Sequence, residues 1–216
     1  DVVLTTPLLR ALRELVQPRR LAVMVRPEAA ALVAGHPDVD EVLLDDKRGG
    51  DGGPGGLLRA ARRLRRERFD VAVSPHRSLR TALMLAAARI PRRIGFRDAP
   101  GAPLYHERVA RDPRHHAVER ILALAGPFGG AVGTPQLSIP VSADARAKAA
   151  ALLPDGPEPL VGLAPGSVWP TKRWSVEGFA AVATALAADG ARCVVLGGPD
   201  EQAMGEEVHR RSGGRT

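Results

Sequence analysis

Residues 163–174, LAPGSVWPTKRW, combine a tight turn with a lysine just before a helical pattern, and this segment is the one best suited to chemistry. A turn between a strand and a helix leaves backbone N–H groups unpaired at the strand's carboxyl end, where they attract phosphate. Hydroxyl groups add donors there, and a lysine adds a mobile charge that suits a diphosphate. The spacing alone also fits an ordinary loop with an exposed Lys-Arg pair. The expected phosphate contacts are Gly166, Ser167, Thr171 and Lys172.

A second turn of this kind follows the next apolar run, at Gly197 and Gly198. Ligands of open parallel sheets bind across neighbouring strand ends, so we expect both turns to line one pocket. Locally, the alternative is a plain turn in which Asp200 caps the following helix.

Asp1 precedes the first helical pattern, at residues 5–16. A carboxylate at this place could take a proton from a hydroxyl as a general base. An Asp near a helix start also commonly serves as a cap or as a partner of the helix dipole. The residues alone do not choose between these roles.

Two further patterns are not interpreted as sites. Gly50, Gly52 and Gly55 match the dinucleotide fingerprint, but Pro54 interrupts them, so we expect a loop. The group of His115, His116 and Glu119 has the spacing of a metal face, but no further ligand cluster completes it. We expect that group to start a helix, and we expect neither a metal nor a cofactor.

The chain is basic, with 31 Lys and Arg against 24 Asp and Glu, and three lysines leave 28 arginines. One interpretation is a compositional bias that puts arginines on solvated helix faces such as residues 59–69; the other is attraction to an anionic partner. The aromatic content of 3% argues against single-stranded nucleic acid. No apolar run approaches the ~18 residues that span a bilayer. Cys193 lies in an apolar run and is expected in the core.

Helical and strand patterns alternate along the chain, which predicts doubly wound, parallel α/β sheets. The Pro-rich segment 154–159 predicts a linker between a domain at 1–153 and a partial domain at 154–216. Because no strand feeds the first helix and few units follow the linker, we expect a chain truncated at both ends. The expected helices are 5–16, 28–35, 57–68, 77–89, 114–125, 143–153, 175–189 and 201–211, and the expected strands are 21–25, 41–45, 70–74, 92–96, 136–139, 160–164 and 192–197.

The segment DVVLTTPLLRALR at the start and the segments APGSVWPTKRW and VVLGGPDE further on resemble glycosyltransferase family 9, the lipopolysaccharide heptosyltransferases. The resemblance is closest to the heptosyltransferase II-like branch. Residues 76–96 and 116–124 also resemble the family's first domain. The resemblance implies a GT-B architecture of two Rossmann-like domains, the N-terminal one on the acceptor side and the C-terminal one binding the nucleotide sugar.

The resemblance also implies an inverting, metal-independent transfer of L-glycero-D-manno-heptose from ADP-heptose to the phosphorylated inner core of lipopolysaccharide. Asp1 matches the family's proposed general base and Lys172 its diphosphate-binding lysine, while Ser167 and Thr171 match the surrounding positions. The family's later Asp-Thr-Gly…His segment has no counterpart before Thr216.

The implied enzyme acts at the cytoplasmic face of the inner membrane, touches it peripherally and binds no nucleic acid. An acidic acceptor gives a reason for some arginines. The alternatives are another nucleotide-sugar enzyme of GT-B shape, such as an epimerase, and a non-catalytic basic module that binds phosphorylated glycolipid. The candidate acceptor contacts are Arg77, Arg80, Arg92 and Arg93.

Overall fold

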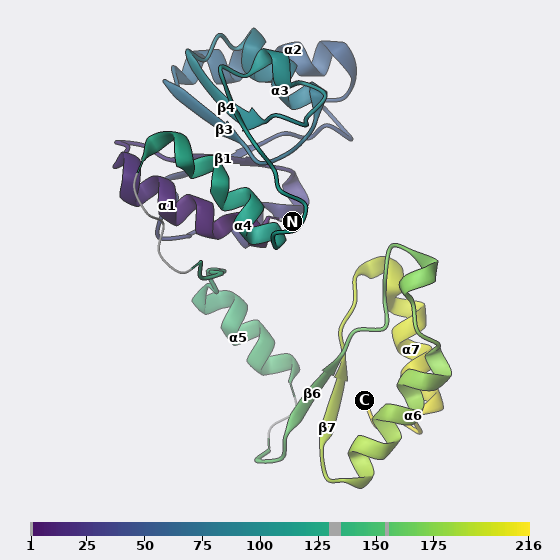
Figure 1. The fold of residues 1–216 in the computed structure, drawn as a ribbon. Helices are drawn as coiled ribbons and strands as arrows, with labels where there is room; N and C mark the ends of the chain where they lie inside the picture. Colours follow the sequence, from purple (N-terminus) through teal and green to yellow (C-terminus); the bar gives the residue numbers. More distant parts are fainter. Residues whose placement is uncertain (1, 130–134, 154–155) are drawn as a thin grey trace. The chain divides into compact units, whose positions relative to one another are not determined.

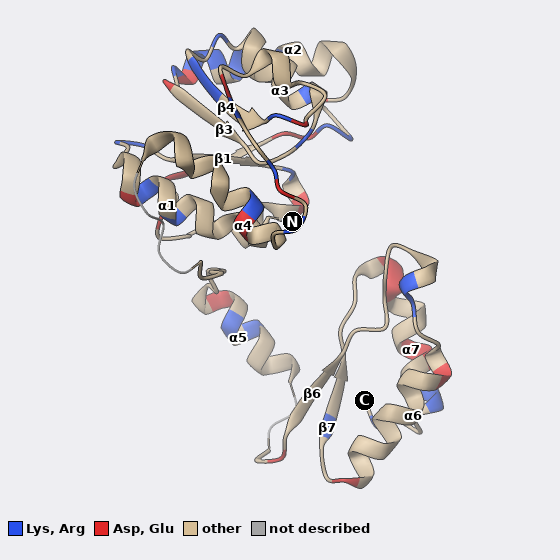
Figure 2. Ribbon diagram, viewed as in Figure 1, with Lys and Arg blue, Asp and Glu red and all other residues tan. Residues whose placement is uncertain are grey.

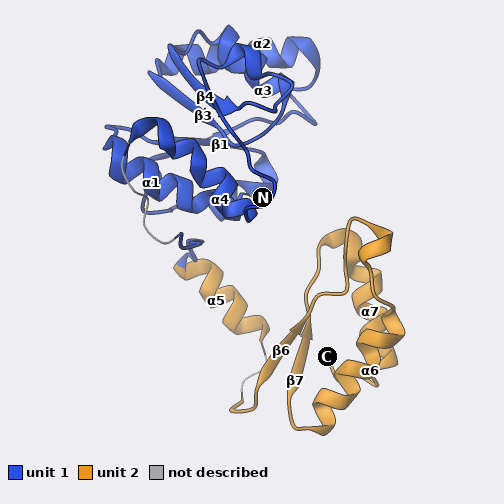
Figure 3. Ribbon diagram, viewed as in Figure 1, with its two compact units in different colours: residues 1–142 blue, residues 143–216 orange. Residues whose placement is uncertain are grey.

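The computed structural model describes residues 2–129, 135–153 and 156–216. The chain divides into two compact units, unit 1 at residues 1–142 and unit 2 at residues 143–216 (Figure 3). This division differs from the expected boundary at residues 153 and 154 by one helix, α5 (Ala143–Leu152), which has no buried residue.

Unit 1 contains two parallel sheets (Figure 1). In one sheet β1 pairs with β2, and in the other β4 pairs with β3 on one side and β5 on the other. Every pairing is parallel, as the strand-helix alternation predicts. The strands are β1 (Ala22–Val25), β2 (Glu41–Leu44), β3 (Val71–Ser74), β4 (Arg92–Phe96) and β5 (Glu107–Val109).

The helices of unit 1 bury their apolar stripes against these strands. Leu8, Leu64, Ile94 and Leu124 lie in one core cluster, and Ile94 and Leu124 are fully buried. Burial of a side chain of this size contributes about 1.5–3 kcal/mol each, so these contacts fix where the strands end. The helices are α1 (Thr6–Val16), α2 (Gly53–Glu67), α3 (Leu79–Ala87) and α4 (Ala117–Leu122), with short 3-10 helices at Val3–Thr5, Pro27–Leu32, Ala102–Leu104 and Ala123–Phe128.

Three expectations about unit 1 are wrong. Residues 107–109, which lie in none of the expected strands, form β5, and residues 136–139, expected to form a strand, are not in one. Helix α2 begins at Gly53 inside the glycine run, because Gly52 is extended and Pro54 suits the first turn. Thr6, the first residue of α1, donates its hydroxyl hydrogen to the Val3 carbonyl oxygen at 2.8 Å.

Unit 2 has one parallel pair, β6 (Leu160–Leu163) with β7 (Arg192–Val195). Leu163, Ala183 and Cys193 form its buried core, which confirms the position expected for the cysteine. Helices α6 (Val176–Ala188) and α7 (Gln202–Arg211) follow the two strands, and 3-10 helices at Pro170–Lys172 and Pro199–Glu201 precede the two helices. Among the residues described in both units, none of the helices is long and apolar enough to cross a bilayer.

Candidate functional site

The turn after β6 is held by its own hydrogen bonds. Pro165 is buried and Gly166 is half-buried, so the turn packs closely on unit 2. The hydroxyl of Ser167 accepts from the N–H of Trp169 at 3.3 Å, and Nε of Arg173 donates to the Ser167 carbonyl oxygen at 2.7 Å. Ser167 and Arg173 therefore shape the turn, and Arg173 is a residue that the sequence expectation did not include.

Lys172 ends the 3-10 helix Pro170–Lys172, where its N–H donates to the Trp169 carbonyl oxygen at 2.9 Å. Its side chain and that of Thr171 are exposed. Within the described part of the chain, the ammonium group of Lys172 has no ion-pair partner, so its charge is available to a ligand. Helix α6 then begins at its cap Ser175, whose hydroxyl accepts from the Gly178 N–H at 3.0 Å.

The turn after β7 closes on a carboxylate. The Gly198 N–H, expected to bind phosphate, donates to a carboxylate oxygen of Glu201 at 2.9 Å, and the Glu201 N–H donates back to the Gly198 carbonyl oxygen at 2.9 Å. Glu201, rather than the expected Asp200, thus caps the start of this helical segment. A Glu placed three residues after the glycine of a Gly-Pro turn is the sequence signal that could have identified this cap.

The two turns of unit 2 meet at the Glu201 carboxylate. A Cβ atom placed on Gly166 would overlap that carboxylate, and one on Gly197 would lie 3.2 Å from it. A pocket of about 610 Å³ opens here, lined by Pro165 from the first turn and by Gly197 and Gly198 from the second. Glu201 lines it too, whereas Ser167, Thr171 and Lys172 are not among its described lining residues.

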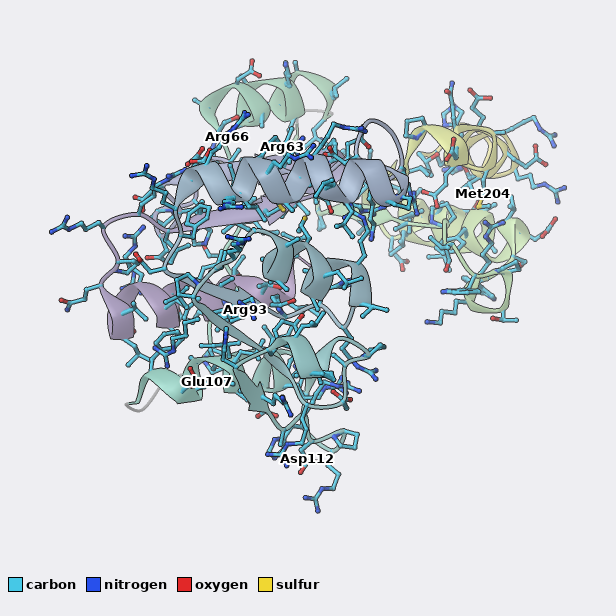
Figure 4. The ribbon with its side chains drawn as sticks, turned by 90° about the horizontal axis from the view of Figure 1, so that it is seen from above. Arg63, Arg66, Arg93, Glu107, Asp112 and Met204 are labelled. Carbon is cyan, nitrogen blue, oxygen red and sulfur yellow. The ribbon has the colours of Figure 1, made fainter. Side chains whose placement is uncertain are left out.

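The arginines expected to bind an acceptor are largely bonded within unit 1. Arg80 forms a 2.6 Å ion pair with Asp45, and Arg93 donates to the Leu104 carbonyl oxygen at 2.9 Å. Arg93 lies at the amino end of β4, in the region where Figure 4 also labels Glu107, rather than at the carboxyl end. Arg92 pairs with Glu107 and stacks its guanidinium over Phe128.

Arg77 is the one of these candidates that follows a strand's carboxyl end, that of β3. Its guanidinium lies 3.5 Å from a carboxylate oxygen of Asp98 and donates to the Asp98 carbonyl oxygen at 2.8 Å. The pair is well exposed, with side-chain exposures of 47% and 40%, so solvent weakens the attraction and a ligand can compete for the arginine.

Two free cations at the same side of unit 1 were missed by the sequence reasoning. Lys47 and Arg48 follow β2, are exposed, and have no ion-pair partner among the residues described. His76 follows β3, and desolvation of its ring together with the charge of Lys47 lowers its pKa. The ends of β2 and β3 therefore bring basic groups together. The signal was available, since the basic pair follows the apolar run of β2 after only two residues, Asp45 and Asp46.

The remaining expectations concern Asp1 and the histidine cluster. Asp1 lies outside the described residues. His116 caps α4, as expected of a helix start: its Nδ1 accepts from the Val118 N–H at 3.3 Å, and Glu119 accepts from the His116 N–H at 2.9 Å. Within the described ranges, no group of three or more His, Cys, Asp and Glu side chains is arranged to hold a metal ion.

Comparison with known proteins gives a family and several relatives. The family model "Glycosyltransferase family 9 (heptosyltransferase)" matches residues 57–213. The lipopolysaccharide heptosyltransferase 2 of Salmonella typhimurium is 27% identical over 219 residues, which cover 96% of this chain and 63% of that protein. The chain thus spans less than two thirds of that relative's length.

Solved structures match along nearly the whole chain. The glycosyl transferase family 9 protein from Veillonella parvula has a TM-score of 0.83 at 25% identity, covering 97% of this chain and 62% of that one. The E. coli ADP-heptose lipopolysaccharide heptosyltransferase II has a TM-score of 0.79 at 24% identity, covering 100% of this chain and 70% of that one. These likenesses confirm the expected α/β fold of the GT-B type.

Proposed function

The chain belongs to glycosyltransferase family 9, and from this premise we propose an inverting, metal-independent heptosyltransferase. It transfers L-glycero-D-manno-heptose from ADP-heptose to a phosphorylated sugar of the lipopolysaccharide inner core. The observation that carries the proposal is the family match over residues 57–213, and the 27% identity to a lipopolysaccharide heptosyltransferase supports the choice of substrates.

In this proposal the C-terminal domain, residues 154–216, binds the donor. Its strand-end pocket and the free charge of Lys172 support this assignment. Because Glu201 already accepts the Gly198 N–H, a like-charged diphosphate is kept from that amide. Lys172, Thr171 and Ser167 therefore hold the diphosphate. The turns at Gly166, Gly197 and Gly198 face the parts of the donor that carry hydroxyl groups. The carboxylate of Glu201 accepts hydrogen bonds from such groups.

The proposed chemistry is a single displacement. Asp1, assigned by resemblance, takes the proton from the acceptor hydroxyl while the oxygen of that hydroxyl attacks the anomeric carbon of heptose. The bond between that carbon and the diphosphate breaks, and ADP leaves on the opposite face, which inverts the configuration. The cationic Lys172 neutralises the charge that grows on the leaving diphosphate, so the step needs no metal.

The N-terminal domain, residues 1–153, takes the acceptor in this proposal. Arg77 with Lys47 and Arg48 contacts its phosphates, because these cations are exposed at the carboxyl side of the strands. Arg80 and Arg93, which bond within unit 1, support that face rather than reaching for the ligand. The acceptor is a membrane glycolipid, so the enzyme works at the cytoplasmic face of the inner membrane, touching it peripherally, without a cofactor and without nucleic acid.

The test measures ADP release from ADP-heptose with defined core acceptors. The enzyme used contains residues 1–216 within a chain as long as those of its relatives. We expect release that requires the acceptor and that persists in a metal chelator. ADP release at the same rate with and without acceptor would argue against a transferase. Acceptor binding with no ADP release would instead support a non-catalytic glycolipid-binding module.

A further inference from the structure

The outer face of helix α2 carries a group of arginines that unit 1 does not use. They line a surface pocket of about 450 Å³, and no acidic residue is among its described lining residues. All are exposed, and in the described part of the chain none of them forms an ion pair. Figure 2 shows the basic residues along α2, and Figure 4 labels Arg66 beside Arg63. This basic face consists of Arg62, Arg65, Arg66 and Arg68.

The basic face differs from the rest of the helix. Arg63, on the neighbouring side, forms a 2.8 Å ion pair with Asp51, and Arg59 bonds to the Gly50 carbonyl oxygen. Arg59 lies two turns before Arg66 on the same stripe, so the pairing does not simply follow one side of the helix. Arg59 and Arg63 bond to the segment before α2, whereas the members of the basic face form no ion pair within the described part of the chain.

The basic face also costs stability. Arg62 and Arg65 are three residues apart and Arg62 and Arg66 four apart, and like charges at these spacings destabilise a helix. The helix dipole favours Arg65 and Arg66, which lie in the last turn, but not Arg62, which lies before it. An anionic surface outside the molecule would offset this repulsion.

The chemistry around the basic face favours a lipid surface over a nucleic acid. Phe69 is the aromatic residue nearest in sequence to the basic face. The guanidinium of Arg20 lies over its ring, 5.0 Å from the ring centre, so no base can stack there. Leu58 lies one turn before Arg62 on the same face and is 44% exposed. Arginines beside an exposed leucine are typical of helices that lie on anionic bilayers.

We propose that the basic face of α2 docks the protein on a bilayer rich in anionic phospholipid headgroups. This inference rests on the proposed function for its choice of a membrane, but it assigns the contact to a surface apart from the strand-end residues proposed to bind donor and acceptor. Docking through α2 concentrates the enzyme where a membrane-anchored acceptor lies.

Vesicle sedimentation tests this inference without any catalytic readout. The purified chain is mixed with vesicles of phosphatidylglycerol and phosphatidylcholine in equal parts, or of phosphatidylcholine alone. We expect binding only to the anionic vesicles, falling as salt screens the charges. The Arg62→Gln/Arg66→Gln variant should bind them about 30-fold more weakly, from about 1 kcal/mol per basic residue.

The matched control is Arg146→Gln/Arg215→Gln, which removes the same charge from exposed arginines outside unit 1. It should bind within about twofold of the parent, because neither residue is on the basic face. Equal losses in both variants, or equal binding to both vesicle types, would overturn the inference. So would an α2 variant that keeps vesicle binding but loses binding to duplex DNA. ADP release by the detergent-solubilised enzyme reports on the proposed transferase separately.

Discussion

At the scale of single residues, Lys172 supplies the most direct test of donor binding. Its exposed ammonium has no ion-pair partner in the part of the chain described, so removing it disturbs little of the fold. A donor aimed at charge that develops in the transition state contributes about 3 kcal/mol, so Lys172→Ala should lower kcat by about two orders of magnitude. Rates of ADP release measure this. Lys148→Ala on α5, which removes only a surface pair with Asp144, should keep its kcat.

The contact between Gly166 and Glu201 predicts an energetic coupling between the two turns of unit 2. An alanine Cβ at Gly166 would push the Glu201 carboxylate away and free the Gly198 N–H that it now accepts. Gly166→Ala should therefore cost about 0.5–2 kcal/mol, the value of a lost helix cap. In a Glu201→Ala background the same change should cost nothing further.

The free energy of unfolding in urea, measured for the four proteins of this double-mutant cycle, checks that coupling. Gly126→Ala is the matched control, because a Cβ there meets nothing within 4 Å and the backbone is not in the left-handed region. Additive costs at Gly166 and Glu201 would contradict the contact.

His76 predicts a pH dependence that involves Lys47. Desolvation of the ring and the charge of Lys47 lower the pKa of His76 below its ordinary 6.5. Between the folded-state pKa of His76 and pH 6.5, this group therefore binds fewer protons in the folded protein than in the unfolded protein. The contribution of this group to stability is present above pH 6.5 and is lost as the pH falls from there through the folded-state pKa.

Lys47→Gln removes one of these two causes, so the pKa of His76 should move up toward its ordinary value. An NMR titration of the imidazole protons measures it. Lys148→Gln, which removes a lysine that is not among the causes of the lowered pKa, should leave the titration of His76 where it was. A His76 titration that does not respond to Lys47→Gln would mean that the two groups are not neighbours in solution.

At the scale of elements, the cap of α4 gives the clearest prediction. His116 accepts the Val118 N–H and Glu119 accepts the His116 N–H, so two N–H groups at the helix start are satisfied reciprocally. His116→Ala should cost about 0.5–2 kcal/mol of stability, measured by urea unfolding. His115→Ala, which removes a neighbouring exposed ring with no such bond, should be nearly neutral.

The sequence predicts the longer elements well and the short ones poorly, for physical reasons. Helix α1 follows from strong apolar periodicity and strand β1 from a short apolar run, and tertiary contacts reinforce both. Strand β5 has three residues between proline-containing segments, so no local pattern predicts it. Only its pairing with β4 makes it a strand. In the described ranges the alternating segment 136–139 pairs with no strand: the Ser138 N–H donates to the Thr6 hydroxyl at 3.1 Å, and Leu137 remains 54% exposed.

Helix α2 and the two turns of unit 2 illustrate a different limit of prediction from sequence. A glycine run suggests a loop, but Gly56 is required where the helix passes the Asp51 backbone, because a Cβ would overlap it. The turns themselves were predictable from strand, glycine and helix order. The cap that Glu201 forms is local, but its approach to Gly166 joins two turns about 30 residues apart in sequence, which no local pattern reports.

At the scale of the whole molecule, charge is distributed in two ways. Many arginines, such as Arg13, Arg80 and Arg111, are paired with carboxylates and serve the fold. Other basic groups form no ion pair in the described part of the chain and contribute to the net charge of +7, among them the basic face of α2 and the cations that follow β2. Both the proposed acceptor contact and the proposed bilayer contact draw on this second class, so high salt should weaken each of them.

The separate cores of the two units predict that they unfold at different denaturant concentrations. Among the described residues, the cluster of unit 1 has sixteen buried residues, contributed by α1, α2, α3, β4 and the segments beside them, whereas the cluster of unit 2 has three, Leu163, Ala183 and Cys193. Stability grows with the apolar surface that a unit buries, so unit 2 should unfold first. The connecting α5 buries nothing that would couple the transitions.

Tryptophan fluorescence separates these transitions, because the chain's two tryptophans, Trp169 and Trp174, both lie in unit 2. The midpoint of the fluorescence change should lie at a lower urea concentration than the midpoint of the far-UV circular dichroism change, which follows the helices of both units. Leu163→Ala should lower the fluorescence midpoint, since such a change costs about 2–5 kcal/mol, whereas Leu124→Ala should lower only the later dichroism transition. Coincident midpoints that move together in both variants would mean that the chain unfolds as one cooperative body.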